Sequence, residues 1–543
     1  MKQIQIIDPT TLETVNYIET NVWHDGTPIT PEKCDNVLYR EFECGVFYKR
    51  QISDIIRISW YRHLMINDDD DASEIINSAI NCAPSNTILD GENGFFNVHS
   101  IWLKSDISFV NFNLKSIGTD ETDISVLCIG NDIDPASIQN PSSPLKSKYA
   151  KRVFDKHNIG ETNITIENVK INGNREAHTM LAYKDGGRHG ISIKGKVSRI
   201  RIKNCSAQFC ATDGLQIYSG LAYAINDDAL FAATDIQIEN LICEWNRRHG
   251  ASGDSITILS VQNSKFNRNG RDINGGLVEG NEGCKNSNNV LFGNGWDMEG
   301  YGVGSNVHDI NFNNCEFIEN IKAGLLLYEA ATGQELTFVK RSNIYINFCK
   351  FDCGIINSEF TAVDITGSQA NLDVGIYLYD HIIFDNCYFM GRFLGKSIKN
   401  ITLRNCYHVY SPTDTFTTRG LFDNVELAIV RNIQTKRYLW SGQHFNLISD
   451  DILAKSVDVN FGQIDAGTLQ TIDIPFPEAE FGDIVTVTLN TLNEIRFREF
   501  TLEGLVAFPG NKVLVTIKNN SNNNEIVASG KMHIFVEKKY VSK

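Results

Sequence analysis

Acidic residues at two places in the sequence have the types and spacing that cleavage of a glycosidic bond requires. Asp297 and Glu299 are separated by one residue in a short apolar segment, and Asp213 and Asp254 each begin a similar segment. Residues two apart on a strand share a face, with Cα atoms roughly 6.5–7 Å apart. Glycosidases hold two carboxyls about 5 Å or about 6.5–9.5 Å apart. Both pairs are therefore candidate catalytic acids.

Asp213 and Asp254 also occupy the same position in two segments of similar form. Aligning the segments on their first residue puts His189, Asp213 and Asp254 in one column, just before each strand. If the coils that carry them are adjacent, like charges raise the pKa of one carboxyl, and a general acid then keeps its proton near neutral pH. The alternatives are turn capping by these aspartates and an ordinary solvated face for Asp297 and Glu299.

Other polar and aromatic residues are placed to hold a sugar chain beside these acids. In each segment the alternate residues point outward from the wall, where aromatic rings and charged groups bind ligands. The substrate-binding candidates are His189, Lys194, Tyr218, Arg247, Arg248, His249, Glu279, Tyr328, Tyr377 and Tyr379. A turn role is the alternative for the histidines and arginines, and structural stacking is the alternative for the tyrosines. Glu279 occupies one of the alternate positions that point inward, so it needs a bulge in its strand to face outward.

These candidates lie in a repeat of short strands and turns. Strands rich in β-branched residues end in asparagine, and Asn168, Asn204 and Asn240 follow one another at 36-residue intervals. Repeats of about 20–50 residues indicate a solenoid. Further copies end at Asn263, Asn314, Asn386 and Asn405. The pattern predicts an all-β chain with a right-handed parallel β-helix over residues 56–445, in which inward apolar residues build the coil and stacked asparagines satisfy the turns.

Different patterns flank the repeat. Residues 1–55 carry the turn signals and aromatic residues of a separate N-terminal segment. Acidic residues at 68–71, followed by apolar residues at helical spacing, predict a helix near 69–81 that caps the open end of the solenoid. Alternating strands with clear turns over residues 446–543 predict an antiparallel β-sandwich for trimerisation or carbohydrate binding.

Composition excludes several classes of function. The formal charge of −16 argues against nucleic acid, which needs a basic face. No apolar run approaches the roughly 18 residues of a transmembrane helix, and the polar start broken by Pro9 is not a secretory signal. The 13 cysteines include no CxxC pair, so we expect reduced, structural cysteines and no metal or other cofactor.

Three regions together resemble one family. They are residues 23–28, 37–39 and 46–50 before the repeat, Trp60, Asp70, Asp71, Ala79 and Ile80 at its entry, and residues 461–462, 482–483, 513–519 and 535–536 at the C-terminal end. This set resembles bacteriophage tailspikes that depolymerise capsular polysaccharide, members of the pectate-lyase-like β-helix superfamily. The glycine-rich GAKGDG piece of such spikes is replaced here by residues 61–67. Segments at 188–193, 212–214 and 254–258 also resemble polygalacturonase fragments, but in another order, so those catalytic roles are not transferred.

The resemblance implies a homotrimer on a virion tail that binds and cleaves a bacterial surface polysaccharide, attached to a tail or baseplate protein through its N-terminal segment. We expect endo-glycosidic hydrolysis, in which one carboxyl protonates the leaving oxygen while another activates water or attacks. One alternative is a lyase, with His249 or a tyrosine as base and Arg247 or Arg248 neutralising a uronate. Another is a non-catalytic receptor-binding spike or adhesin. An active site between trimer subunits is a third.

Overall fold

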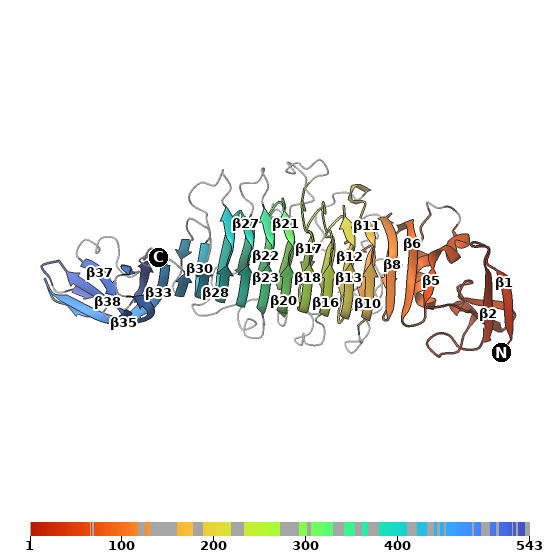
Figure 1. Cartoon of the computed structure of the whole chain (residues 1–543), viewed down its shortest axis with the longest axis horizontal. Coiled ribbons are helices and arrows are strands. Elements are labelled where there is room, and N and C mark those ends of the chain that lie inside the picture. The colour runs from red at the N-terminus through yellow and green to blue at the C-terminus, as the bar shows by residue number, and fades with distance from the viewer. Residues whose placement is uncertain are drawn as a thin grey trace, which may run out of the picture.

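Parallel β-strands dominate the molecule. In the computed structural model the described residues are 2–65, 67, 70–117, 125–130, 160–177, 188–218, 233–271, 293–300, 306–329, 341–352, 361–367, 379–409, 421–431, 439–441, 446–449, 452–480, 483–489, 500–506, 510–523, 525–527 and 530–537. Strands make up 60% of the chain and helices 7%, which confirms the all-β class and the parallel β-helix. Figure 1 shows a long stack of coils between an N-terminal sheet and a C-terminal group of strands.

Each coil passes through three faces, and each strand pairs in parallel with the strand one coil away. Face A comprises β10 (Thr162–Glu167), β13 (Ser198–Lys203), β16 (Ala233–Glu239), β18 (Ile256–Gln262), β20 (Val307–Asn313), β23 (Arg341–Asn347) and β26 (Asp380–Asp385). Face B comprises β11 (Lys170–Asn172), β14 (Ser206–Gln208), β21 (Glu316–Ile318), β24 (Lys350–Asp352), β27 (Tyr388–Met390) and β29 (Tyr407–Val409). Face C comprises β7 (Ile101–Leu103), β9 (Leu127–Gly130), β12 (Ile191–Lys194), β15 (Leu215–Tyr218), β17 (Ala251–Gly253), β19 (Trp296–Gly300), β22 (Ala323–Glu329) and β25 (Thr361–Gly367).

Longer strands turn a corner at the two ends of the stack. Near the N-terminal end, faces A and B share β6 (Thr87–Val98) and β8 (Ile107–Ser116). Near the other end, faces C and A share β28 (Arg392–Arg404) and β30 (Leu421–Arg431), and β31 (Leu439–Ser441) and β32 (Asn446–Ser449) follow. The stack is therefore continuous from end to end.

The N-terminal end is closed by a small sheet and a helix. The sheet has the order β1 (Gln3–Ile7), β2 (Thr14–Thr20), β4 (Val46–Arg50), β3 (Tyr39–Glu43). The short helices η1 (Pro31–Lys33) and η2 (Ile58–Leu64) belong to this end, and η3 (Arg175–Ala177) follows β11 within the coils. Before β6, β5 (Ile55–Arg57) starts the first coil. Helix α1 (Ser73–Cys82) begins after the acidic run rather than within it, and it buries Ile76, Ala79 and Ile80 in the β-helix core.

A buried ion pair fixes the N-terminal sheet to this end. Arg50 Nη1 donates to Asp8 Oδ2 at 2.6 Å, and both side chains are 1% exposed. The Arg50 guanidinium also lies 3.8 Å from the centroid of the Trp60 ring in η2. Because the pair is buried and stacked on an aromatic face, the sheet and the first coil are held in one arrangement.

Asparagines stack at the corner between faces A and B, as the sequence predicted. Asn168 Nδ2 donates to Asn111 Oδ1 at 3.1 Å, and Asn240 Nδ2 donates to Asn204 Oδ1 at 2.9 Å. All four have φ between 53° and 61°, in the left-handed region that asparagine tolerates better than most residues. The corner conformation and the side-chain ladder therefore depend on the same residue type.

Apolar residues alternate into the coil as predicted, with one exception. Ile191, Leu215, Trp296 and Leu325 are fully buried. Ile258, however, has the inward position that alternation assigns to it in the segment beginning at Asp254, and it is 54% exposed. The segment 254–258 turns a corner at Ser255 (φ 45°) and continues on face A, where Ile256 pairs with Ala233 and Val307. The prediction was wrong because the face C strand of that coil is β17, whose small residues show no apolar alternation.

Buried thiols line part of the interior. Eleven cysteines lie in the described residues; all eleven are free, and nine of them are buried. Cys315, Cys349, Cys387 and Cys406 each precede a face B strand, and these strands pair coil to coil. They therefore form a column of small side chains that packs the corner.

The C-terminal strands form an antiparallel β-sandwich with its own core. The strands are β33 (Ile452–Val459), β34 (Gly462–Ile464), β35 (Leu469–Glu480), β36 (Ile484–Leu489), β37 (Phe500–Val506), β38 (Gly510–Asn519), β39 (Glu525–Val527) and β40 (Gly530–Glu537). One sheet pairs β33 and β36 with β40, and another has the order β35-β38-β37. Val515, Ile517 and Ile534 lie in a core separate from that of the coils. Among the residues described, no helix is long and apolar enough to span a bilayer.

The asparagine ladder predicts a ranked effect of substitution at Asn240. Alanine removes the side-chain hydrogen bond and keeps a β-carbon in the left-handed region, which costs about 1–2 kcal/mol in conformation alone. Glycine removes only the hydrogen bond, worth about 0.5–1.5 kcal/mol. Thermal unfolding at one fixed scan rate should rank wild type above Asn240→Gly and Asn240→Gly above Asn240→Ala. An alanine variant as stable as wild type would contradict the ladder.

Candidate active site

The strand register on face C sets which candidate residues lie side by side. Leu215 pairs with Ile191 and with Ala251, and Ala251 pairs with Trp296, which pairs with Leu325. Three rows of side chains follow from this alignment. The entry row, before the strands, is His189, Asp213, His249 and Asn294; the middle row is Ser192, Gln216, Ser252, Asp297 and Leu326; the exit row is Lys194, Tyr218, Asp254, Glu299 and Tyr328.

The register separates two acids that the sequence placed together. Asp213 lies beside His249, because the Gly214 amide donates to the His249 carbonyl at 3.1 Å. Asp254 lies at the far end of β17, where its amide donates to the Ile217 carbonyl at 3.0 Å. The two aspartates are on adjacent coils but roughly 16 Å apart along the strand direction. The predicted column of His189, Asp213 and Asp254 is therefore wrong at Asp254.

Asp213 is a buried carboxylate held by four donors. Arg248 Nε and the His249 amide donate to Oδ1 at 2.7 and 3.0 Å, while Arg248 Nη2 and Ser252 Oγ donate to Oδ2, the latter at 2.6 Å. Burial raises the pKa of such a carboxyl, but the Arg248 charge and these hydrogen bonds outweigh it and hold the pKa of Asp213 well below its usual value. Asp213 is therefore ionised at neutral pH.

His249 and Asp297 form the second part of this buried network. The Asn294 amide donates to His249 Nδ1 at 3.1 Å, which leaves the proton of the neutral ring on Nε2. His249 Nε2 lies 3.1 Å from Asp297 Oδ2, which also accepts a hydrogen bond from Asn294 Nδ2 at 2.8 Å. Burial lowers the pKa of His249 well below its usual value, so the ring is neutral and donates to Asp297.

The remaining entry-row histidine is also buried. His189 Nδ1 lies 2.9 Å from Thr212 Oγ1 and 3.4 Å from Asp213 Oδ2. Burial lowers its pKa, against the opposing effect of the Asp213 carboxylate. The imidazole is 0% exposed, so His189 is placed to support Asp213 rather than to contact a sugar.

Several residues that were predicted to point outward into solvent are buried. Asp213, Asp254, Asp297 and His249 are 0–2% exposed, because the polar groups of neighbouring coils pack against one another. Tyr379 is 1% exposed and lies just before β26 on face A, away from face C. The expectation of an open acidic wall was therefore wrong for these residues.

The exit row combines acids with partly exposed aromatic residues. Lys194, Tyr218 and Tyr328 are half-buried. Asp254 directly follows Gly253, and Glu299 directly follows Met298, the strand partner of Gly253. These two acids therefore occupy one level on adjacent strands, with a tyrosine strand on either side. The side chain of Glu299, together with the whole of Glu279 and Tyr377, lies outside the described residues.

The arginines predicted to bind substrate have partners within the protein. Arg248 pairs with Asp213, and Arg247 Nη2 donates to the Arg175 carbonyl at 2.6 Å. Arg248 is only 13% exposed. The Arg248 guanidinium therefore joins neighbouring coils, and the Arg247 guanidinium joins coils two apart.

Sequence reasoning missed Ser252, Thr212 and Asn294 in this network. The missing signal was a column of glycines, each one residue before the first aligned apolar position of face C, at Gly190, Gly214, Gly250, Gly295 and Gly324. A Cβ at Gly250 would lie 2.5 Å from the Gly295 carbonyl oxygen, so this column accepts no side chain. Aligning the coils on glycine rather than on aspartate places Ser252 beside Asp297. Within the described residues no three His, Cys, Asp or Glu side chains are grouped to hold a metal.

Comparison with known proteins finds similarity only among solved structures. No family profile and no curated protein matches the chain. The tailspike gp49 from Acinetobacter baumannii bacteriophage Fri1, a capsular polysaccharide depolymerase, is 9% identical, covering 98% of this chain and 94% of that one, with a TM-score of 0.32. The adhesin PfbA of Streptococcus pneumoniae is 12% identical, covering 85% and 98%, with a TM-score of 0.45.

The pectate lyase Pel9A is 11% identical, covering 63% of this chain and 70% of that one, with a TM-score of 0.32. The structures similar to this chain thus include a phage tailspike and a pectate lyase, the group that the sequence resembles.

The buried Asp213–Arg248 pair predicts a pH-dependent effect of Arg248→Met. The variant leaves a buried carboxylate without its cation, a loss of about 3–5 kcal/mol at neutral pH. Because the folded pKa of Asp213 in wild type is depressed, the pair stabilises at pH values above the unfolded pKa, and this stability is lost as the pH falls through the folded pKa. The difference between wild type and variant should therefore narrow below about pH 4.

Arg268→Met is the matched control, since Arg268 pairs with Glu319 at the surface, with side chains 40% and 29% exposed. It should lower the unfolding midpoint only slightly. Thermal unfolding of the three proteins across pH 3–8 makes the comparison. An Arg248→Met deficit that stays constant with pH would contradict the assigned charge of Asp213.

Proposed function

We propose that the chain is a tailspike that binds and depolymerises a bacterial surface polysaccharide by endo-glycosidic hydrolysis on face C. The observation that carries this proposal is the exit row. Asp254 and Glu299 occupy one level on adjacent strands, flanked by Tyr218 and Tyr328. Adjacent strands lie about 4.8 Å apart, a scale compatible with a pair of glycosidase carboxyls.

The four candidate acids divide into two roles. Asp213 is ionised and has four hydrogen-bond donors, and Asp297 accepts from His249 and Asn294, so both suit positioning of the coil. Asp254 and Glu299 are then the proposed catalytic pair. One protonates the glycosidic oxygen as its bond to the anomeric carbon breaks, and the other activates water or attacks that carbon.

Lys194, Tyr218 and Tyr328 are the proposed sugar-binding residues. They are half-buried and lie along the exit row, so a chain that crosses the strands would contact all three in turn. The tyrosine rings offer stacking surfaces, and Lys194 offers a cation for acidic substituents. Glu279 and Tyr377 remain proposed substrate contacts.

Two observations weigh against a lyase that uses His249 as the base and Arg248 to neutralise a uronate. Neutral His249 donates its Nε2 proton to buried Asp297, so it is not placed as a base toward solvent. The Asp213 carboxylate already pairs with Arg248, so the Arg248 charge is not available to neutralise a uronate. We therefore favour hydrolysis by the exit-row acids over a lyase that uses these residues.

We also propose the assembly that the resemblance implies. Residues 1–55 attach the spike to a phage tail or baseplate protein, 56–445 carry the active site, and 446–543 support a homotrimer on the virion tail. Exposed apolar side chains on the sandwich support contact between copies, since Leu469, Ile484 and Leu505 are 54–64% exposed.

Substitution of the exit-row acids tests the proposed reaction. Asp254→Asn and Glu299→Gln should each reduce oligosaccharide release from capsules by about 100-fold or more, since general acid–base catalysis contributes roughly 10²–10⁴-fold. Asp235→Asn is the control, because Asp235 is a partly exposed acid on face A. Release is followed by mass spectrometry of products from candidate capsules.

Both acid variants must keep the wild-type unfolding midpoint for this result to count. Full release by both variants would sink the proposed pair. Products with an unsaturated uronate, seen by ultraviolet absorbance, would establish a lyase instead. Cell binding by wild type without any released sugar would establish an adhesin.

A further inference from the structure

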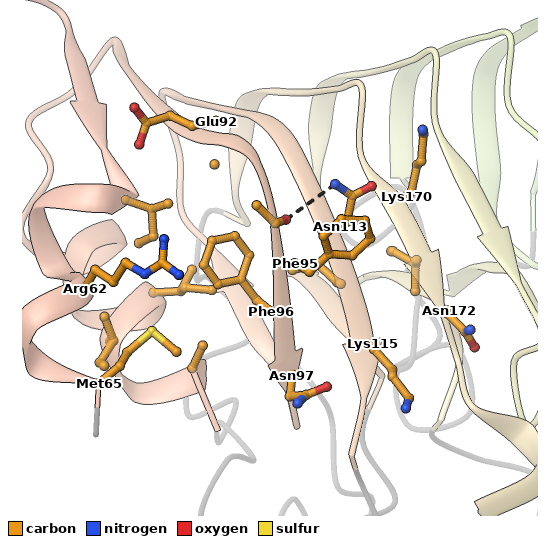
Figure 2. Close-up of a pocket in the computed structure, with 18 of the residues that line it drawn as sticks. Arg62, Met65, Glu92, Phe95, Phe96, Asn97, Asn113, Lys115, Lys170 and Asn172 are labelled. Carbon is orange, nitrogen blue, oxygen red and sulfur yellow. Dashed lines mark hydrogen bonds between the residues drawn. The ribbon is translucent and has the colours of Figure 1, made fainter. Parts of the chain in front are cut away.

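A cavity of about 770 Å³ lies between the capping segment and the first coils of face B. On one side it is bounded by Ile58, Arg62 and Met65 of the η2 region and by α1. On the other side it is bounded by β6, β8, β11 and β14, as Figure 2 shows. Its volume is within the range of about 300–1,000 Å³ that is usual for ligand sites. The cavity lies on a different face from the proposed active site.

Two outward rows of side chains form the floor of this cavity. Strand register aligns Phe95, Asn113, Lys170 and Ser206 in one row, and Asn97, Lys115, Asn172 and Gln208 in the other. The inward row between them is Phe96, Leu114, Ile171 and Ala207, which packs the coil. The floor therefore spans three strand spacings, about 14 Å, and presents amides, cations and one aromatic ring.

A bulge in β6 directs Phe95 into the cavity. The register shifts between Asp90 and Gly94, and Glu92 and Asn93 within the bulge have φ of 53° and 59°. Asp90 Oδ1 holds the bulge by accepting from the Glu92 amide at 2.8 Å and from Asn111 Nδ2 at 3.0 Å. Bulges commonly re-aim side chains beside functional sites. This one is therefore a fixed part of the fold.

The bulge gives the two adjacent phenylalanines opposite roles. Phe96 packs on Phe112, with ring centroids 5.6 Å apart. Phe95 is 84% exposed, more than any other large apolar side chain that the structure describes. In Figure 2 its ring lies beside Asn113. Phe95 therefore offers an open aromatic surface next to hydrogen-bonding amides.

The charge of the cavity is opposite to that of the chain. Arg62, Lys115 and Lys170 line it, and Glu92 is the only carboxylate among the described residues of the lining, whereas the chain carries a net charge of −16. Lys115 and Lys170 lie one coil and two residues apart, and neither ammonium has a carboxylate partner within the described ranges. These local cations attract a short ligand with spaced negative charges. The net negative charge of the whole chain disfavours long polyanions such as nucleic acid.

We propose that this cavity is a second, non-catalytic binding site for an acidic oligosaccharide. A sugar ring stacks on Phe95, carboxylates of the sugar pair with Lys115 and Lys170, and Asn113 and Asn172 hydrogen-bond hydroxyls. Because the site lies on face B at the N-terminal end, it holds the polymer apart from the point of cleavage. It does not depend on hydrolysis at face C.

The test measures binding to the full chain by calorimetry, and mass spectrometry of each sample checks that the probe stays uncleaved. The probes are a size-defined oligogalacturonate and a neutral malto-oligosaccharide of the same length. The oligogalacturonate should bind, more weakly as salt rises, and the neutral sugar should bind at least about tenfold more weakly, a difference of about 1.4 kcal/mol. Phe95→Ala and the double variant Lys115→Gln/Lys170→Gln should each weaken oligogalacturonate binding by about tenfold or more.

Tyr407→Ala and Lys350→Gln are matched controls on distant coils of face B, at side chains 45% and 47% exposed. They should leave the affinity unchanged. Equal binding of the neutral sugar, no binding of the acidic one, or an affinity unaffected by the Phe95 and lysine changes would each overturn the proposal. These outcomes are independent of the active-site proposal, since the experiment measures binding of an uncleaved probe.

Discussion

The parallel register between coils is the constraint on which the rest of this structure depends. Strands one coil apart lie about 4.8 Å from each other, so every residue stacks on the residue at the same position in the next coil. The asparagine corner and the glycine column both follow from this contact. A Cβ at Gly214 would lie 2.8 Å from the Gly250 carbonyl oxygen, which fixes the residue type. The same register puts Asp254 beside Glu299.

Stacking also sorts the acids of face C by their position along the strand. In the entry row, four donors hold Asp213, and Arg248 compensates its buried charge. In the exit row, Asp254 and Glu299 lie on adjacent strands between the strands that carry the half-buried Tyr218 and Tyr328, and Asp254 itself is 2% exposed. A carboxylate that accepts from four donors, as Asp213 does, stabilises a fold but is poorly placed for proton transfer. The two ends of the short strands thus serve different purposes in this account, one structural and one catalytic.

The sequence predicted the β-helix because its signals are local: asparagine at each corner and apolar alternation in each strand. The register of face C was predicted incorrectly at one coil. Ala251, Ser252 and Gly253 on face C carry no apolar pattern, whereas the segment that begins at Asp254 has apolar alternation but continues on face A. The burial of Asp297 depends on His249 and Asn294 from neighbouring positions, which no single segment reveals. The cavity beside Phe95 was not foreseen, because it needs both the β6 bulge and the placement of the capping segment.

The most direct test of the central claim is a crystal structure of the Asp254→Asn protein with an oligosaccharide released from its capsule. We expect sugar electron density across the exit row of face C, between Tyr218 and Tyr328, with a glycosidic oxygen within hydrogen-bond reach of residue 254 or Glu299. A sugar chain bound only in a groove between subunits, or only on faces A and B, would contradict it.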